Sequence, residues 1–346
     1  MGACRVFIHE VQSASPGHLC RAAAGPLLLA LLSAQAAGAA DSPPLTLESK
    51  ISLGEVSGRI DHLAVDLNRQ RLFVAELGND TVGVVDLKEH KTVQTLRGFK
   101  EPQGIGYVPS TDTVYVANGG NGVVRILQGA DLTAAGQIEL GDDADNVRVD
   151  EAAHQVLVGY GGGAIAVIDM TSHGKLTDIP LKAHPESFRL DASGKRIYVN
   201  VPRNHEIAVV DRVARKQTAG WSTGILLSNY PLILDEPHQH ILSVFRIPAR
   251  LGVFGEDGKL VTRVETCGDS DDAFIDGKRN LVYVICGAGY VDVLRPSGDT
   301  YARLGRIETN SGARTGLFVP ELDRLIVAVR ARGSEPAAVW VYRPEP

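Results

Sequence analysis

The sequence repeats itself seven times, with a period of about 42 residues. Each repeat begins at a residue that starts a turn, and a run rich in β-forming residues opens six residues later. The repeats start at Asp66, Val108, Asp150, Asp191, Asp235, Asp276 and Val319. The matching runs are Leu72–Ala75, Val114–Ala117, Val156–Gly159, Ile197–Asn200, Ile241–Val244, Val282–Ile285 and Leu325–Ala328. A fixed period in this range, made of strands and turns without a helical pattern, predicts an all-β, seven-bladed β-propeller.

Each repeat contains up to four short apolar runs separated by turn residues. The second repeat predicts strands at Gly104–Val108, Thr113–Ala117, Val123–Leu127 and Ala134–Leu140. These runs are almost continuously apolar, as expected when a blade is covered on both faces by its neighbours. The sequence therefore predicts four-stranded blades.

The last repeat lacks a fourth strand. It supplies Gly316–Val319, Leu325–Val329 and Val339–Tyr342, and the sequence then ends at Pro346. The alternating segment Leu45–Leu53 precedes the first repeat and needs a partner. Pairing Leu45–Leu53 with Val339–Tyr342 would close the ring and remove an exposed sheet edge, so we expect the N-terminal strand to join the last blade.

Residues 1–40 have the pattern of an export signal. Arg21 is followed by the apolar run Ala22–Leu32, and Ala36–Ala40 supplies the small residues of a cleavage site. The apolar run is too short to anchor the chain across a bilayer, so we expect no membrane span. Because the region before Arg21 is long and contains Glu10, the true start is expected downstream of Met1. We therefore expect a periplasmic or secreted protein with one propeller domain over residues 41–346.

Composition and cysteine usage limit the partners and the chemistry. The isoelectric point near 5.9 and the aromatic content of 5% argue against a nucleic-acid surface, and we expect a monomer. Cys4 and Cys20 fall in the signal, whereas Cys267 and Cys286 remain in an oxidising compartment. We predict that Cys267 and Cys286 form a disulfide, with two buried thiols as the alternative.

Two segments carry a resemblance to a known family. Tyr115–Asn118 reads Tyr-Val-Ala-Asn, and Tyr198–Asn200 reads Tyr-Val-Asn. They resemble the Tyr-Val-Thr-Asn signature of the YVTN-repeat β-propeller family. The resemblance covers roughly residues 45–346 and implies a seven-bladed, exported propeller. It carries no chemistry of its own, because the signature is a strand-packing pattern.

Two motifs that look catalytic are better explained as parts of the sheet. Gly220–Gly224 matches the G-x-S-x-G pattern of a nucleophile elbow, but it falls in an expected outer strand with no helix after it. Gly159–Gly163 is rich in glycine like a phosphate loop, but it joins two expected strands and predicts a tight hairpin. We therefore assign no catalytic residue.

A ring of polar residues precedes the innermost strand of every blade. Five residues before each repeat start stand Asp61, Gln103, Asp145, Glu186, Tyr230, Asp271 and Arg314. The next positions are His62, Gly104, Asn146, Ser187, Pro231, Asp272 and Thr315. Equivalent positions in a propeller surround the central channel, so we predict a negatively biased channel mouth. Its candidate binding residues are Asp61, His62, Gln103, Asp145, Asn146, Glu186, Asp271, Asp272 and Arg314. The alternative is that these side chains cap strand starts and satisfy loop N–H groups.

Loops between the second and third strands of a blade open on the same face of the propeller. They add Arg203, His205, Arg246, Arg250, Arg330 and Arg332. These cations either pair with the acidic ring or remain solvated, since exposed pairs are common and weak. Alternatively they bind an anionic group of a ligand, and for that role the candidates are Arg203, His205, Arg246 and Arg330.

Two functions are compatible with this mouth. The first is a binding or scaffold module that recognises a small molecule or a protein partner at this face. The second is a cation-dependent, lactonase-like hydrolase. In that hydrolase Asp61, Asn146, Glu186 and Asp271 would hold Ca²⁺, Mg²⁺ or Mn²⁺, with His62 as the base. The sequence names no cofactor and no metal.

Overall fold

The computed structural model describes residues 43–346. The predicted export signal over residues 1–40 lies outside this range. Within it, no helix is long and apolar enough to cross a membrane.

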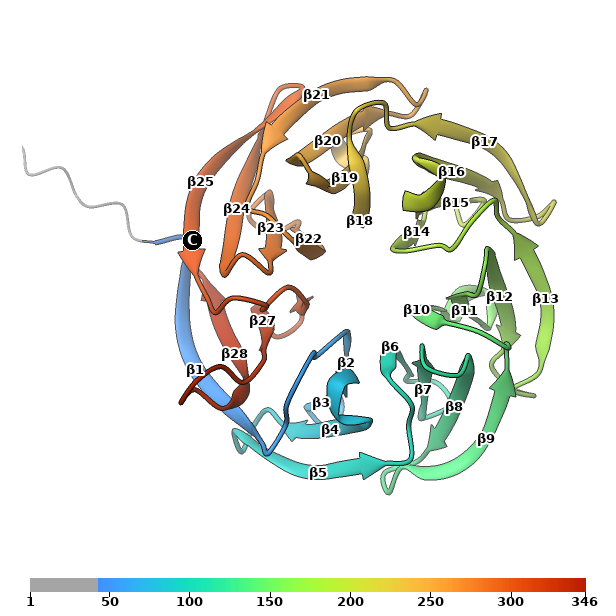
Figure 1. The fold of residues 1–346 in the computed structure, drawn as a ribbon, viewed down its shortest axis with the longest axis vertical. Coiled ribbons are helices and arrows are strands. Elements are labelled where there is room, and N and C mark those ends of the chain that lie inside the picture. Colours follow the sequence, from blue (N-terminus) through green and yellow to red (C-terminus); the bar gives the residue numbers. More distant parts are fainter. Residues whose placement is uncertain (1–42) are drawn as a thin grey trace, which may run out of the picture. The chain divides into compact units, whose positions relative to one another are not determined.

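Residues 43–346 form seven four-stranded antiparallel sheets arranged as the blades of a ring (Figure 1). The first blade is β2 (Leu63–Asp66), β3 (Arg71–Glu76), β4 (Thr81–Asp86) and β5 (Lys91–Arg97). The second is β6 (Pro102–Val108), β7 (Thr113–Asn118), β8 (Val123–Gln128) and β9 (Thr133–Glu139). The third is β10 (Ala144–Asp150), β11 (Gln155–Tyr160), β12 (Ala164–Asp169) and β13 (Lys175–Pro180). The fourth is β14 (Phe188–Leu190), β15 (Arg196–Val201), β16 (Glu206–Asp211) and β17 (Lys216–Ser222).

The fifth blade is β18 (Leu227–Asp235), β19 (His240–Ile247), β20 (Ala249–Gly255) and β21 (Leu260–Glu265). The sixth is β22 (Ser270–Asp276), β23 (Leu281–Cys286), β24 (Tyr290–Ser297) and β25 (Thr300–Glu308). The last is β26 (Gly316–Val319), β27 (Arg324–Val329), β28 (Ala337–Pro344) and β1 (Leu45–Gly54). Four single-turn 3₁₀ helices lie in the connections: η1 (Leu77–Asn79), η2 (Glu151–Ala153), η3 (Pro202–Asn204) and η4 (Glu236–His238).

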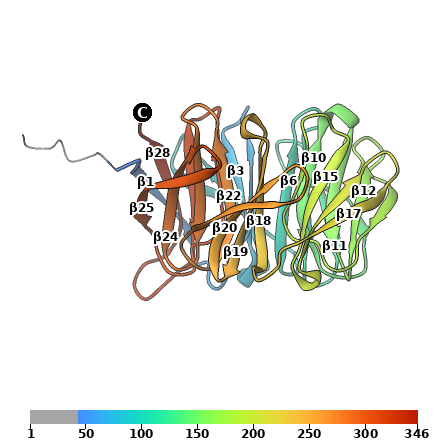
Figure 2. The same ribbon diagram turned by 90° about the horizontal axis from the view of Figure 1, so that it is seen from above.

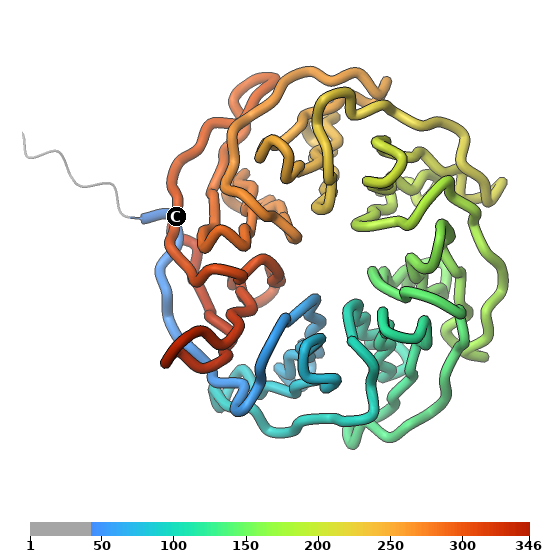
Figure 3. The backbone as a smooth tube through the Cα atoms, in the orientation of Figure 1, coloured from blue at the N-terminus to red at the C-terminus, as the bar shows by residue number. Residues whose placement is uncertain are grey.

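The blades follow the chain around the ring and close it with the first described strand. The backbone trace brings β1 alongside β28 (Figure 3). The two strands pair antiparallel, with Leu45 opposite Pro344 and Ile51 opposite Val339. This confirms the predicted closure by the N-terminal strand.

Apolar side chains between neighbouring blades hold the ring together. All six residues of β7 are buried, whereas six of the seven residues of the outer strand β9 are exposed. Tyr115 of β7 packs in one cluster with Val147 and Val156 of the third blade. Seen from the side, the strands run between two faces on which the loops lie (Figure 2). The face where the innermost strands begin holds the channel mouth.

Arginine–aspartate contacts connect adjacent blades near the opposite ends of these strands. Arg69 Nη1 lies 2.8 Å from Asp66, and its Nη2 lies 2.7 Å from Asp112 of the next blade. Arg279 repeats this arrangement with Asp276 at 2.9 Å and Asp323 at 2.6 Å. The repeat starts Asp66 and Asp276 are therefore structural residues that link blades.

A disulfide joins Cys267, which follows β21, to Cys286 at the end of β23, with a Cα–Cα distance of 5.8 Å. The bridge links the connection after the fifth blade to the sixth blade. The G-x-S-x-G segment begins in β17 and is followed by a turn and then β18. Gly161–Gly163 forms the turn between β11 and β12. Neither segment precedes a helix, so neither has the setting that its motif needs.

Candidate functional site

β-bulges aim the polar ring into the channel. In four blades the pairing register between the innermost strand and its neighbour shifts by one residue. The shifts lie between Pro102 and Ile105, Ala144 and Val147, Asn229 and Leu232, and Ser270 and Asp272. A residue with positive φ lies just before each shift: Glu101 (49°), Asp143 (34°), Ser228 (61°) and Asp269 (60°). A bulge leaves one residue outside the ladder and redirects its side chain. Gln103, Asp145, Tyr230 and Asp271 occupy these unpaired positions.

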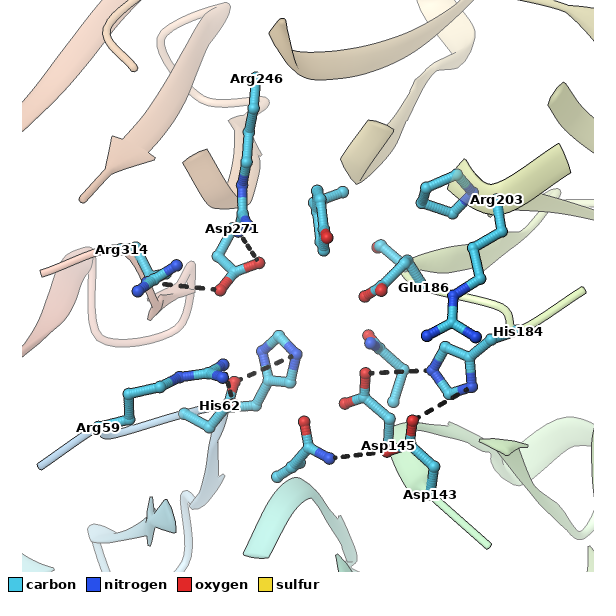
Figure 4. A pocket seen from close by; sticks show the side chains of 16 residues that line it. Arg59, His62, Asp143, Asp145, His184, Glu186, Arg203, Arg246, Asp271 and Arg314 are labelled. Carbon is cyan, nitrogen blue, oxygen red and sulfur yellow. Dashed lines mark hydrogen bonds and ion pairs between the residues drawn. The ribbon is translucent and has the colours of Figure 1, made fainter. Parts of the chain in front are cut away.

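The redirected side chains line a mouth pocket of about 240 Å³ (Figure 4). Its lining residues are Arg59, Asp61, His62, Gln103, Asp143, Asp145, Asn146, His184, Glu186, Ser187, Pro202, Arg203, Tyr230, Arg246, Asp271 and Arg314. Eight of the nine predicted ring residues are among them, as are Arg203 and Arg246 from the predicted loops.

Asp272 does not line the mouth pocket, contrary to the prediction. It is back in register, opposite Ile285, so its side chain lies below the pocket floor. There it accepts a hydrogen bond from His62 Nδ1 at 3.2 Å and another from the Gly316 N–H at 3.0 Å. Asp272 therefore orients His62 from beneath.

The other predicted loop cations also lie away from the mouth pocket. His205 caps the C-terminal end of η3 with a left-handed backbone conformation, and its side chain is exposed. Arg330 lies against the backbone of Gly312. Arg250 lies in β20, 3.8 Å from Glu265, because the β19–β20 turn is too short to include it. Arg332 forms an isolated bridge with Glu335. Sequence position alone does not fix the direction of loop side chains.

The structure adds Arg59, Asp143 and His184 to the site, and sequence reasoning missed all three. Each stands two residues before a ring residue, namely Asp61, Asp145 and Glu186. The same repeat register that identified the ring would have found them, had it been read two positions further back. Pro202 of η3 completes the set.

Two arginines neutralise one side of the mouth. Arg246 Nη2 lies 2.7 Å from Asp271 Oδ1, and Arg246 also stacks 3.6 Å above the Tyr230 ring. Arg314 Nη1 lies 3.0 Å from Asp269, and its Nε is 3.8 Å from Asp271. This side of the pocket is therefore a compensated network in which arginine and aspartate hold each other in place.

A second network surrounds Asp61. Arg59 donates to its carboxylate at 3.1 Å, and His62 Nε2 lies 3.8 Å away. Burial raises the pKa of Asp61 to about 7, although His62 partly opposes this rise. Burial disfavours the imidazolium of His62, but Asp272 outweighs it and raises the pKa of His62 to about 10. His62 is therefore a cation at neutral pH and does not suit the role of general base.

Glu186 and Asp145 form the least compensated part of the mouth. No ion pair or hydrogen bond from residues 43–346 reaches the carboxylate of Glu186, which points into the cavity (Figure 4). Burial, and then the charges of Asp145 and Asp271, raise the pKa of Glu186 to about 8. Asp145 is only 7% exposed, and its nearest cation is His184 Nε2 at 3.9 Å.

His184 is shared between Asp145 and acceptors on its other side. Its Nδ1 donates to the Gly161 carbonyl at 2.7 Å, and Asp143 lies 3.7 Å from the same nitrogen. Burial opposes protonation of His184, but Asp145, and then the Gly161 carbonyl and Asp143, raise its pKa to about 9. Among residues 43–346, His184 is thus the one cation at ion-pair distance from Asp145, and no cation is that close to Glu186.

The acids of the mouth are not arranged as a metal-binding site. Across residues 43–346, no three His, Cys, Asp or Glu side chains are grouped closely enough to hold a metal ion. The ligand set predicted for a hydrolase is spread around the ring, and the arginines already engage Asp271.

Comparisons with known proteins identify the fold alone. No protein-family model matches the sequence, and no similar protein is found among curated sequences. Among solved structures, the chain resembles Kuenenia stuttgartiensis hydrazine synthase with a TM-score of 0.70. The match covers 79% of this chain and 93% of that chain, at 15% sequence identity. This similarity supports the seven-bladed propeller architecture and says nothing about its chemistry.

Proposed function

We propose that this protein is an exported β-propeller binding module whose mouth pocket holds a small polar ligand with a cationic group. The observation that carries the proposal is the pair of acids Glu186 and Asp145. Glu186 faces the cavity with no ion pair, and its neighbour Asp145 has only His184 at 3.9 Å, while Asp61 and Asp271 each have an arginine partner at 3.1 Å or less. Two neighbouring carboxylates with a single imidazolium beside one of them repel each other until a further cation lies between them.

The size of the pocket supports a small ligand. A volume of about 240 Å³ is slightly below the usual range of pockets for drug-sized molecules. The exposed guanidinium of Arg203 at the rim is available for an anionic or hydroxyl group on the same molecule. The pocket therefore suits a compact molecule with an ammonium group at one end and a polar group at the other.

Export and membership of the YVTN-repeat family are parts of the same proposal. The Cys267–Cys286 disulfide suits an oxidising compartment, as does the signal pattern of residues 1–40. Tyr115–Asn118 lies within the buried strand β7, where the family signature would belong. A protein partner at the mouth face would use the same acids. The dispersed acids and the protonated His62 do not favour the hydrolase, so we propose the binding function alone.

A matched set of small probes tests this proposal. Ethanolamine, ethylene glycol and glycolate have similar sizes but carry positive, neutral and negative charge. We expect calorimetric titration at pH 8.5 to detect ethanolamine binding and no binding of the other two. Glu186→Gln should weaken ethanolamine binding at least tenfold. Glu256→Gln, at an exposed position outside the pocket, should leave it unchanged. Equal binding of all three probes, or equal affinities of the wild type and Glu186→Gln, would contradict the proposal.

A further inference from the structure

A second cavity lies deeper in the channel, below the mouth pocket. Its volume is about 300 Å³. Most of its wall is apolar and comes from the innermost strands, through Leu63, Val65, Ile105, Val149, Phe274 and Leu317. Arg148 of β10 and Arg189 of β14 also line it.

The two arginines occupy equivalent positions in adjacent blades, each two residues before the start of a repeat. At that position the other five blades carry Ala64, Gly106, Ile233, Phe274 and Leu317. None of those five residues is charged. Arg148 and Arg189 thus replace apolar residues in an otherwise apolar ring of the channel wall.

Every hydrogen-bond acceptor of these guanidinium groups is neutral. Arg148 donates to Asn146 Oδ1 at 2.9 Å, to Ser187 Oγ at 3.4 Å, and to the carbonyls of Val147 at 2.8 Å and Phe188 at 3.1 Å. Arg189 donates to the same Ser187 Oγ at 3.2 Å and to the same Phe188 carbonyl at 3.0 Å. The two positive groups therefore meet at one serine hydroxyl.

No carboxylate forms an ion pair with these charges. Among residues 43–346, none lies within ion-pair distance of either guanidinium. Asp272 is the acid that lines the cavity; it attracts both guanidinium groups from beyond ion-pair distance, and its hydrogen bonds go to His62 and the Gly316 N–H. Burial, and then repulsion from Arg189, lower the pKa of Arg148 to about 9. Two half-buried like charges that share a hydroxyl and have no acid at ion-pair distance are costly, and a bound anion would lower this cost.

We propose that this lower cavity is a second binding site, for a small monocarboxylate with an apolar tail. The carboxylate would lie between the guanidinium groups of Arg148 and Arg189, whose planar forks match its two oxygens. The tail would lie along Leu63, Val65, Phe274 and Leu317. This site differs from the mouth pocket in position and in the sign of the charge that it binds, so it does not depend on the function proposed for the mouth.

A chain-length series tests the site on the unmodified protein. Acetate, butyrate and hexanoate are titrated by calorimetry at constant ionic strength, with 1-hexanol and chloride as controls. Each buried methylene adds to the affinity, so we expect hexanoate to bind at least tenfold more tightly than acetate. The alcohol should not bind. No detectable hexanoate binding, the same affinity for hexanoate and chloride, or binding of 1-hexanol as strong as that of hexanoate would overturn the proposal.

Variants locate the site. Arg189→Gln should weaken hexanoate binding at least tenfold, and Arg189→Lys should retain part of it. Arg263→Gln, at an exposed position of β21, and Glu186→Gln, in the mouth pocket, should leave it unchanged. Unchanged hexanoate affinity in Arg189→Gln would refute the assignment. A loss in Glu186→Gln equal to that in Arg189→Gln would instead place hexanoate in the mouth.

Discussion

Replacing Glu186 by glutamine should stabilise the folded protein at alkaline pH. The folded state raises the pKa of this carboxyl to about 8, whereas an unfolded chain leaves it near the ordinary value of about 4.3. Between these two values the folded protein holds a proton that the unfolded chain has released. Stability that depends on this proton is fully present below about pH 4 and is lost as the pH rises through 8. Glutamine resembles the protonated form and removes the loss.

The magnitude follows from the size of the pKa shift. One pKa unit corresponds to 1.36 kcal/mol, so a shift of even one unit makes Glu186→Gln more stable by about 1 kcal/mol at pH 9. For a chain of this size, that corresponds to a rise in melting temperature of roughly 2 °C. At pH 4, wild type and variant should melt together.

Thermal melts at pH 4, 6, 8 and 9 measure this difference, with Glu256→Gln as the control for loss of an exposed carboxylate. The gap between Glu186→Gln and the wild type should open between about pH 4 and pH 8 and stay constant at pH 9, and the control should show no such gap. If Glu186 instead caps a strand, its loss should cost on the order of 1 kcal/mol at every pH at which it is ionised. A variant that is less stable than the wild type at pH 9 would refute the reasoning.

Three further outcomes follow. A chain that starts at residue 54 loses β1, whose Leu45, Ile51 and Leu53 are at most 2% exposed. It should melt at a lower temperature and self-associate through the free edge of β28; a monomer with unchanged melting would contradict the closure. Alkylation of the exported protein without reductant should label neither Cys267 nor Cys286, and reduction should cost about 3 kcal/mol of stability; two labelled thiols in the intact mass would disprove the bridge. Ethanolamine affinity should rise about tenfold from pH 6.5 to 8.5 as Glu186 ionises, and Glu186→Gln should abolish this dependence, which calorimetry at both pH values decides.

The sequence predicted the ring because every repeat follows the same register. In each repeat the turn residues and the apolar runs lie at the same distances from the repeat start. The strands predicted for one blade therefore support those predicted for the next. The pairing of Leu45–Leu53 with the last blade followed from a strand missing at one end and a spare strand at the other. Such arguments need only chain order and the rule that sheet edges are covered.

Only those site residues that occupy equivalent positions in the repeats could be predicted from the sequence. Asp145 and Glu186 were found because equivalent positions surround one axis. Asp272 was misplaced because the β-bulge that turns Asp271 into the channel cannot be located from sequence alone. The directions of His205 and Arg330 depend on loop backbone, which follows no repeat. The register already places Arg148 and Arg189 side by side, but only the structure shows that their partners are all neutral.

The central claim is that the mouth pocket binds a cation between Glu186 and Asp145. A crystal structure of the protein soaked with ethanolamine at pH 8.5 tests it most directly. The account predicts density for the ligand in the mouth pocket, with its nitrogen within hydrogen-bond distance of both carboxylates. A mouth that holds only water at a saturating concentration, or a ligand that lies outside the ring of Asp61, Asp145, Glu186 and Asp271, would contradict the account.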